Sequence, residues 1–254
     1  MSMETAKVER LRVFPVKSLE GVDVTEVEVL EGGTLKRDRE YAVFDADGEV
    51  VNGKRTPRVH RPDLRLEEGA PVVSFPDDKG VNVANNRERA EELFGDFFGV
   101  DATVSRDDER GYVDRRSMGP SVVSTATLRE FASWFDTTVE SARRRLRANV
   151  EVSGVPAFWE DRFVGHEAPS FEVGGVRFEG VTPCGRCVVP SRDPDTGKEK
   201  GGFRERFIEK RREAFPEWAD EDAFDHRYTV MIIARVPEQE RGGTVGVGDE
   251  VRVV

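Results

Sequence analysis

The sequence predicts a β-rich α+β fold made of two parts. Apolar and polar residues alternate in short runs through the first eighty residues, which is the pattern of half-buried strands. In four later segments apolar residues recur at every third or fourth position, which is the period of a helix. With 254 residues, the chain is long enough for one large domain or two modest ones.

The first part is expected to consist mainly of strands. Residues 8–16 and 23–30 each predict one strand. Residues 41–52 predict a hairpin whose Asp-Ala-Asp-Gly turn places Gly48 in a left-handed conformation. Further short strands are expected at 64–67, 72–75 and 81–83. The turn signals between these runs have the spacing of a barrel or a sandwich.

A domain boundary is expected after the first predicted helix. This helix covers residues 86–98 and ends at Gly99, and charged runs follow at 107–110 and 115–116. We place an N-terminal β-barrel-like domain at 1–112 and a second domain at 113–254. A solvated loop inside a single domain is the alternative interpretation of the charged runs.

The second part combines helices and strands. Helices are expected at 125–135, capped by Ser124 or Thr125, at 139–146 and at 203–215. Strands are expected at 149–153, 170–173, 176–178, 187–190 and 228–236. The last of these is the most apolar and should lie in the centre of its sheet. The tail predicts a glycine-rich turn and a closing strand.

The charge balance excludes one class of function. The chain carries 50 acidic against 39 basic residues, a net charge of −11, whereas a nucleic-acid-binding protein needs a basic face. Eight of the 39 basic residues are Lys, so Arg dominates. This composition indicates either a salt-adapted surface or a GC-rich genome. No apolar run is long enough to span a membrane or to form a signal core, so a cytoplasmic protein is expected.

The only cysteines, Cys184 and Cys187, lie together in Pro-Cys-Gly-Arg-Cys. They could form half of a zinc site completed by His60, His166 or His226. They could also form a redox dithiol, although the predicted strand after them is not the helix that such a pair requires. Core packing, or one thiolate ligating a soft, high-valent metal, are the remaining interpretations.

Five motifs, in order along the chain, resemble those of one family. They are Phe14-Pro15-Val16-Lys17-Ser18, Lys36-Arg37-Asp38-Arg39-Glu40-Tyr41, Leu146-Arg147-Ala148-Asn149-Val150, the Cys184–Cys187 motif with Asp-Pro-Asp-Thr-Gly behind it, and Gly246-Val247-Gly248-Asp249. The chain thus resembles MOSC-domain proteins that carry the MOSC N-terminal β-barrel domain. Within that family it resembles the mitochondrial amidoxime-reducing component and its bacterial counterparts.

The resemblance implies a MOSC β-barrel flanked by helices and a molybdenum cofactor (molybdopterin). Cys187 aligns with the metal-ligating and catalytic cysteine, and Cys184 is then core or lies near the ligand. The positions implied for cofactor binding are Lys17, Ser18, Arg39, Ser117, Arg147 and Asn149. Met118 departs from the hydroxyl residue usual in the family. For each arginine, a surface salt bridge is the alternative interpretation.

The resemblance also implies a function, the reduction of small N-hydroxylated substrates with electrons from a separate donor protein. Gly242, Gly243, Gly246 and Gly248 lie in a β-rich tail and open no helix, so they do not predict a dinucleotide fold. A non-enzymatic cofactor carrier and a sulfur-carrier protein are the alternatives, and the wider family's link to pyridoxal phosphate belongs to the latter.

Two weaker candidates also stand out in the sequence. Residues 193–197, Asp-Pro-Asp-Thr-Gly, predict a turn rather than a cation site. Trp159 with Glu160 and Asp161 could line a substrate entrance, with burial in the core as the alternative.

Overall fold

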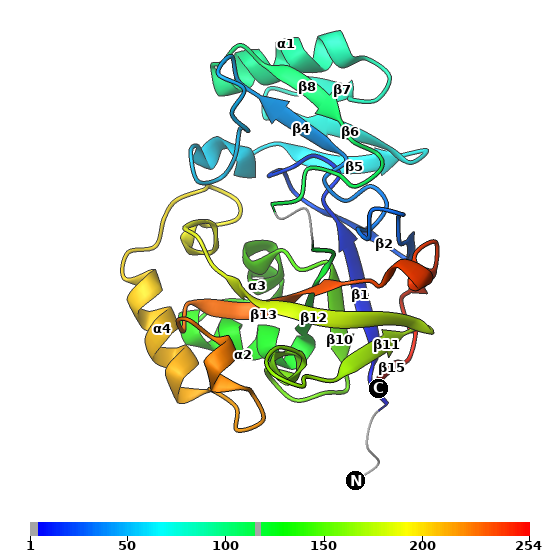
Figure 1. Cartoon of the computed structure of the whole chain (residues 1–254). Helices are drawn as coiled ribbons and strands as arrows, with labels where there is room; N and C mark the ends of the chain where they lie inside the picture. Colours follow the sequence, from blue (N-terminus) through cyan, green and yellow to red (C-terminus); the bar gives the residue numbers. More distant parts are fainter. Residues whose placement is uncertain (1–4, 115–117) are drawn as a thin grey trace.

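The computed structural model describes residues 5–114 and 118–254, and the chain folds into two lobes (Figure 1). The larger, which we call the sheet lobe, is built on an eight-stranded sheet with three helices. The smaller, the cap lobe, contains β4 to β8 and α1 and is made by residues 41–106. The predicted β-rich α+β class is confirmed. The proposed division at residue 112 stays a prediction.

The eight-stranded sheet joins both ends of the chain to its middle. Its strand order is β15-β11-β12-β13-β9-β10-β1-β2. All neighbours are antiparallel except β9 and β10, which are parallel and need a crossover connection. The bounds are β1 Lys7–Val13, β2 Val22–Val24, β9 Ser121–Ser124, β10 Val150–Ser153, β11 Ser170–Val173, β12 Val176–Gly185, β13 Thr229–Arg235 and β15 Val251–Val253.

Two helices form the crossover between β9 and β10, and a third lies beside them. They are α2 Thr125–Phe135, α3 Val139–Leu146 and α4 Phe203–Glu213. Ser124 caps α2 by accepting from the Thr127 N–H. Successive side chains of a strand point to opposite faces of the sheet and so belong to two different hydrophobic cores. Val122 and Ile232 lie in the core on the far face, and Val123 lies in the core beneath the helices.

The cap lobe contains two small sheets and one helix. β4 Tyr41–Phe44 pairs with β8 Thr103–Arg106, and β6 Ala70–Ser74 lies between β5 Asp63–Glu67 and β7 Gly80–Asn82. The helix α1, Arg87–Phe98, begins at the Asn86 cap and ends at Gly99, whose φ of +75° suits glycine. Separately, β3 Glu26–Glu28 pairs with β14 Thr244–Gly246.

Five short 3₁₀ turns complete the described elements. They are η1 Pro57–His60, η2 Trp159–Phe163, η3 Val189–Ser191, η4 Glu221–Ala223 and η5 Glu238–Glu240. No helix in the described part of the chain is long and apolar enough to cross a membrane.

The expected hairpin at 41–52 is confirmed: Val51 N–H donates to Val43 O, Phe44 and Val50 form an antiparallel bridge, and Gly48 has a φ of +75°. The strand β4 also pairs with β8.

Two other expectations about strands were wrong. The run 23–30 breaks at Thr25 into β2 and β3, which pair with different partners. Residues 187–190 form no strand, because the chain enters the 3₁₀ turn η3 there. β8 and β9 were not predicted at all.

Candidate functional site

The Cys-Gly-Arg-Cys motif lies where β12 ends. Cys184 is the penultimate residue of that strand, Cys187 is in the loop before η3, and both thiols are free and partly exposed. Between them, Arg186 donates through Nη1 to Cys184 Sγ (3.1 Å) and through Nη2 to Leu146 O (3.0 Å). Arg186 therefore ties the cysteine motif to the C-terminus of α3, one residue before Arg147.

Two hydrogen bonds hold Cys187. Its carbonyl accepts from the Tyr228 hydroxyl at 3.0 Å, and its sulfur accepts from the Val189 N–H at 3.5 Å. The second contact exists because the chain turns tightly into η3. These two contacts fix the position of the Cys187 sulfur in the loop, and a cysteine binds metals through that atom.

Two arginines from opposite halves of the chain lie over one phenyl ring. The Cζ atom of Arg147 is 4.2 Å and that of Arg39 is 5.1 Å from the centroid of the buried Phe14 ring. Arg39 is also paired with Asp38. Arg147 donates to Leu19 O at 2.7 Å and makes no ion pair with any carboxylate in the described ranges. The structure thus brings together two of the residues implied to bind the cofactor.

Burial depresses the pKa of the Arg147 guanidinium to about 10, and the neighbouring cations Arg39 and Arg12 act in the same direction. Glu20 opposes the shift. A pKa near 10 leaves Arg147 a cation at neutral pH, although poorly solvated. A poorly solvated cation without a carboxylate partner is suited to bind an anion.

Lys17 and Ser18 precede this pair of arginines in the chain and lie next to Leu19. The Lys17 ammonium donates to Tyr112 O and to Asp114 Oδ1, both at 2.6 Å. Burial favours the neutral Asp114 carboxyl, but the ion pair with Lys17 outweighs it and leaves the Asp114 pKa below its usual range. Of its two acceptors, Asp114 is the negatively charged one, and an incoming anion would have to displace it from Lys17.

Strained backbone marks three of the implied positions. Ser18, Arg39 and Arg147 have φ values of +75°, +57° and +60°, which non-glycine residues seldom adopt. Such residues persist only where the surrounding structure fixes them, and they gather at binding and catalytic sites. Arg147 adopts this conformation because it is the C-terminal cap of α3.

Asn149 and Ser117 are the remaining two residues that the resemblance implies for cofactor binding. The Asn149 side chain is buried, accepts from Ser121 N and Oγ at 3.1 and 3.0 Å, and donates to Arg12 O at 3.1 Å. Its polar atoms thus join β9, β10 and β1. Ser117 lies outside the described residues.

His60 was considered only as a zinc ligand, yet it lies close to this group. Its Nε2 atom is buried without a hydrogen-bond partner among the described residues, and a Cβ on Gly53 would lie 3.8 Å from it. Burial lowers the His60 pKa to about 4, and Arg147 adds to the effect. His60 is therefore a neutral imidazole at physiological pH. The signal that reveals it is an unpartnered buried atom, which no sequence pattern encodes.

The loop after the cysteine motif is held against the cap lobe. Asp193 Oδ1 accepts from the N–H groups of Asp195 and Thr196, so the expected turn at 193–197 is confirmed. A Cβ on Gly197 would lie 2.6 Å from Pro57 O, and Arg192 donates to Gly53 O at 3.0 Å. The same loop therefore connects Cys187 with the segment that carries His60.

The prediction that Trp159, Glu160 and Asp161 line a substrate entrance is wrong. Trp159, Glu160 and Asp161 are 4%, 0% and 1% exposed, because η2 packs them into the core. Trp159 contacts the rings of Phe163 and Phe171.

The side chains gathered at this site fit the molybdenum cofactor that the resemblance implies. Cys187 offers one partly exposed sulfur, Arg147 a cation without a carboxylate, and His60 Nε2 and Arg186 Nε are buried polar atoms without partners in the part of the chain that the structure describes. Among residues 5–114 and 118–254, no three His, Cys, Asp or Glu side chains are grouped to hold a metal ion. A cofactor with an anionic end and with metal ligands of its own would fit these residues, because the protein offers one sulfur from Cys187 and one cation from Arg147.

Comparison with known proteins gives one consistent picture. Residues 5–141 match the model of the MOSC N-terminal beta barrel domain, and residues 118–252 match that of the MOSC domain. Mitochondrial amidoxime reducing component 2 of Macaca fascicularis is 25% identical over 238 residues, covering 76% of this chain and 69% of that protein. The human protein of that name is 24% identical over 240 residues, with the same coverage of 76% and 69%.

Two further proteins are similar. Molybdenum cofactor sulfurase of Bos taurus is 22% identical over 258 residues, which cover 80% of this chain and 29% of that protein. The crystal structure of the YuaD protein from Bacillus subtilis aligns with a TM-score of 0.42 at 18% identity, covering 98% of this chain and 96% of that one.

Proposed function

This chain belongs to the MOSC family and carries the MOSC N-terminal domain, and from that membership we propose that it is a molybdenum-cofactor-dependent oxidoreductase. The family is associated with molybdenum cofactor binding, and relatives at about a quarter identity are named amidoxime reducing components. The substrate class we propose is small N-hydroxylated compounds. The proposed setting is the cytoplasm.

The observation that carries the proposal is the contact between the cysteine motif and the end of α3. Arg186, which lies between the two cysteines in the chain, binds Cys184 Sγ and Leu146 O. The motif that contains the partly exposed Cys187 thiol is thereby held to the residue before Arg147, a cation without a carboxylate partner in the described ranges. A metal thiolate needs the thiol, and the phosphate of a pterin needs the cation. An isolated buried cation would otherwise cost stability.

Each residue then has a separable part in binding. Cys187 donates its thiolate to the metal, while the Val189 N–H and the Tyr228 hydroxyl fix the sulfur and the carbonyl of the same residue. Arg147 and Arg39, whose guanidinium groups lie over the Phe14 ring, orient the anionic group. When bound, the cofactor supplies the two-electron redox chemistry, and the protein supplies position and electrostatics.

Electrons are proposed to come from a separate protein. The glycines of the tail surround β14, which pairs with β3, so this glycine-rich segment leads into a strand rather than into a helix that would hold a dinucleotide phosphate. A reduced donor protein or an artificial one-electron reductant would then be required.

The test is an assay of cofactor-loaded protein with benzamidoxime. We expect turnover with reduced viologen and none with NADH alone. Turnover with NADH alone, in protein free of contaminating reductase, would contradict the separate donor. Turnover with neither reductant would contradict the oxidoreductase and favour the carrier or sulfur-carrier functions.

A further inference from the structure

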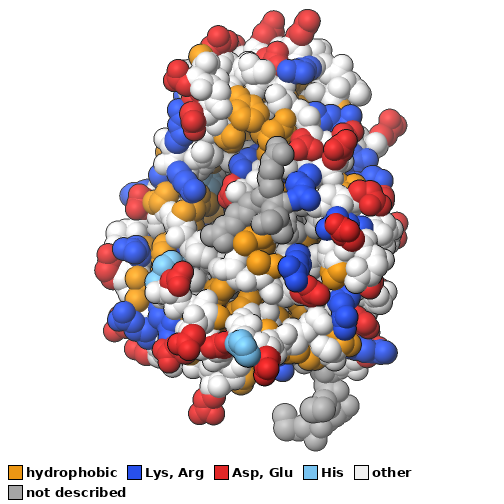
Figure 2. All heavy atoms as spheres, viewed as in Figure 1, with side chains coloured by type: hydrophobic (Ala, Val, Ile, Leu, Met, Phe, Trp, Pro, Cys, Tyr) orange, Lys and Arg blue, Asp and Glu red, His pale blue; other side chains and the backbone are white. Residues whose placement is uncertain are grey.

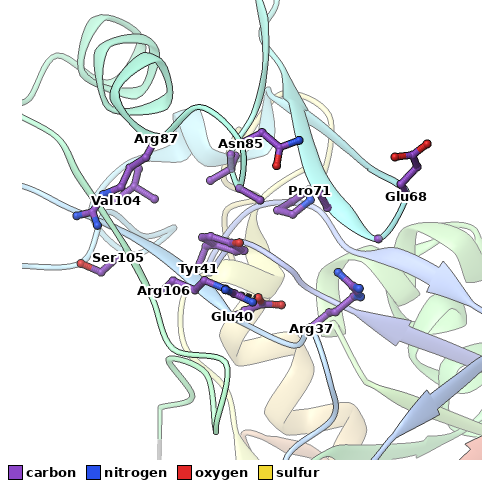
Figure 3. Close-up of a pocket in the computed structure, with 14 residues that line it drawn as sticks. Arg37, Glu40, Tyr41, Glu68, Pro71, Asn85, Arg87, Val104, Ser105 and Arg106 are labelled. Carbon is purple, nitrogen blue, oxygen red and sulfur yellow. Dashed lines mark hydrogen bonds and ion pairs between the residues drawn. The ribbon is translucent and has the colours of Figure 1, made fainter.

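A cavity of about 440 Å³ lies in the cap lobe, and none of the residues proposed to hold the cofactor lines it (Figure 3). Its walls come from the β4–β8 ladder on one side and from β6 and the start of α1 on the other. It therefore needs an explanation independent of the cofactor.

Three arginines line this cavity, and two of them are neutralised. Arg106 Nε donates to Glu40 at 2.6 Å, and Arg87 Nε donates to Glu91 at 3.0 Å. Arg37 is different: its side chain makes no hydrogen bond or ion pair with any residue in the described ranges. Within those ranges it is the cation of the cavity wall that lacks a counter-ion.

The backbone is arranged to place Arg37 at the cavity. Arg37 itself has a φ of +67°, a conformation that an arginine seldom adopts. Opposite it, a Cβ on Gly69 would lie 2.4 Å from Arg37 Nη2, so the guanidinium packs against bare backbone. Gly69 also has a positive φ, +80°, which makes any other residue there unfavourable. The positive φ values of Arg37 and Gly69 thus both help to place the Arg37 guanidinium.

The rest of the lining suits an organic body rather than a bare ion. Figure 3 shows Tyr41 and Pro71 between Arg37 and the start of α1, with Asn85 and Ser105 nearby. Burial is the main cause that raises the pKa of the Tyr41 phenol, so its hydroxyl stays a neutral donor. Arg87 is the first residue of α1, so the positive end of that helix dipole also lies at the rim.

We propose that this cavity binds a small organic monocarboxylate, with its carboxylate on Arg37 and its apolar body against Tyr41 and Pro71. One cation without a counter-ion matches one negative charge, and the planar guanidinium fork matches the two oxygens of a carboxylate. A phosphate dianion would leave one charge uncompensated, because Arg37 is a single cation, Arg106 and Arg87 are paired with carboxylates, and Glu68 also lines the cavity.

The experiment is titration calorimetry on the full chain at low salt, with benzoate as the probe. Benzamide has the same ring without the charge, and inorganic phosphate has the charge without the ring. We expect saturable binding of benzoate and weaker or no binding of the other two. Phosphate binding more tightly than benzoate would contradict the carboxylate assignment.

The variant Arg37→Asn removes the charge, and asparagine tolerates the left-handed backbone. It should lose about tenfold or more in benzoate affinity, the usual scale for one charge-assisted contact. Arg65→Ala on β5 is the matched control, because Arg65 is exposed and does not line the cavity. Thermal melting should show both variants folded. Benzoate binding that is absent in the wild type, or unchanged in a folded Arg37→Asn protein, would overturn the proposal.

Discussion

The sulfur atoms of Cys184 and Cys187 have different surroundings although the residues are three apart. Cys184 packs against the aromatic core beneath the helices, and its sulfur accepts from Arg186. Cys187 has left the strand, and its sulfur accepts from a backbone N–H. The β12 backbone presents the first thiol to the core, and the second lies in the loop between β12 and η3.

We therefore expect Cys187→Ala to lose bound molybdenum and turnover, since it removes the only sulfur ligand proposed from the protein. Cys184→Ala is the matched control and should keep most of both, because its sulfur only completes a contact with Arg186. Molybdenum per chain, measured by elemental analysis, and viologen-driven turnover are the readouts. Wild-type values in the Cys187 variant would refute the ligand assignment.

At the scale of single residues, the sequence predicted the site residues that belong to recognisable motifs. It did not predict those whose role depends on how distant segments pack together. Arg39 and Arg147 were named by motif, and they lie over the same ring. His60 and Arg186 were not assigned to the site, because an unpartnered Nε2 or Nε arises only when distant segments meet. Asn149 was named from its motif, but its hydrogen bonds to Ser121 could be seen only in three dimensions.

At the scale of elements, η2 and α4 enclose a group of charges inside the sheet lobe. Arg211 of α4 is fully buried, pairs with Asp161 of η2, donates to Thr229 O at 3.1 Å, and lies 4.2 Å from the Phe158 centroid. Glu160, next to Asp161, accepts from the Ser124 N–H at 3.2 Å, and its Oε1 has no partner in the described ranges. Burial, with the charge of Asp161, raises the Glu160 pKa to about 7.

This raised pKa predicts a pH dependence of stability. The folded state holds the Glu160 proton up to about pH 7, whereas the unfolded state releases it near pH 4.5. Between these values the folded state binds more protons, so the free energy of unfolding should fall as pH rises and level off above pH 7. Because each tenfold change in proton affinity corresponds to about 1.4 kcal/mol, the fall should be at most about 3 to 4 kcal/mol.

Glu160→Gln mimics the protonated acid and should remove most of this fall. Urea unfolding of the variant at pH 5 and pH 8 measures it. Glu209→Gln, on the exposed side of α4, serves as the control and should follow the wild type. A Glu160→Gln protein that loses as much stability as the wild type between the two pH values would show that Glu160 is not the group responsible.

Elements with local signals were predicted, and elements that depend on distant partners were not. The helix α1 ends at Gly99 and the helix α2 begins after Ser124, and in each case that single residue predicts the boundary. β8 and β9 are four residues each and become strands only by pairing with β4 and with β10 and β13. Residues 187–190 look like a strand by composition, but the chain turns there to place Cys187.

Across the whole molecule, contacts between segments far apart in the chain converge on the site. Arg192 of the sheet lobe reaches Gly53 O of the cap lobe, and Arg144 joins Glu20 at 3.0 Å and Asp195. Arg147 is central to this group because it touches Phe14 and Leu19 O from the end of α3. On the face that Figure 2 shows, acidic and basic side chains are mixed.

We expect Arg147→Asn to weaken cofactor retention by about 1.5–3 kcal/mol, the usual loss for one charge-assisted contact. Asparagine is chosen because it accepts a φ of +60° without added strain. Pterin per chain in purified protein, measured by fluorescence after oxidation, reports the effect without any assay of turnover. Arg129→Ala, an exposed change on α2, is the control. Equal pterin content in all three proteins would make Arg147 a purely structural residue.

The pairing of the first strands has a consequence for biosynthesis. Leu11 of β1 lies opposite Val150 of β10, and Val27 of β3 lies opposite Val245 of β14. While the ribosome is still making the chain, β1 emerges long before β10 and can pair only with β2, and β3 emerges long before β14. The cap lobe can form in that interval, because its apolar core consists of residues between 41 and 104 with Val16 and Leu19 packed against them. A chain released before residue 245 would therefore carry an unpaired β3 edge, which is the kind of surface that chaperones bind and that drives aggregation.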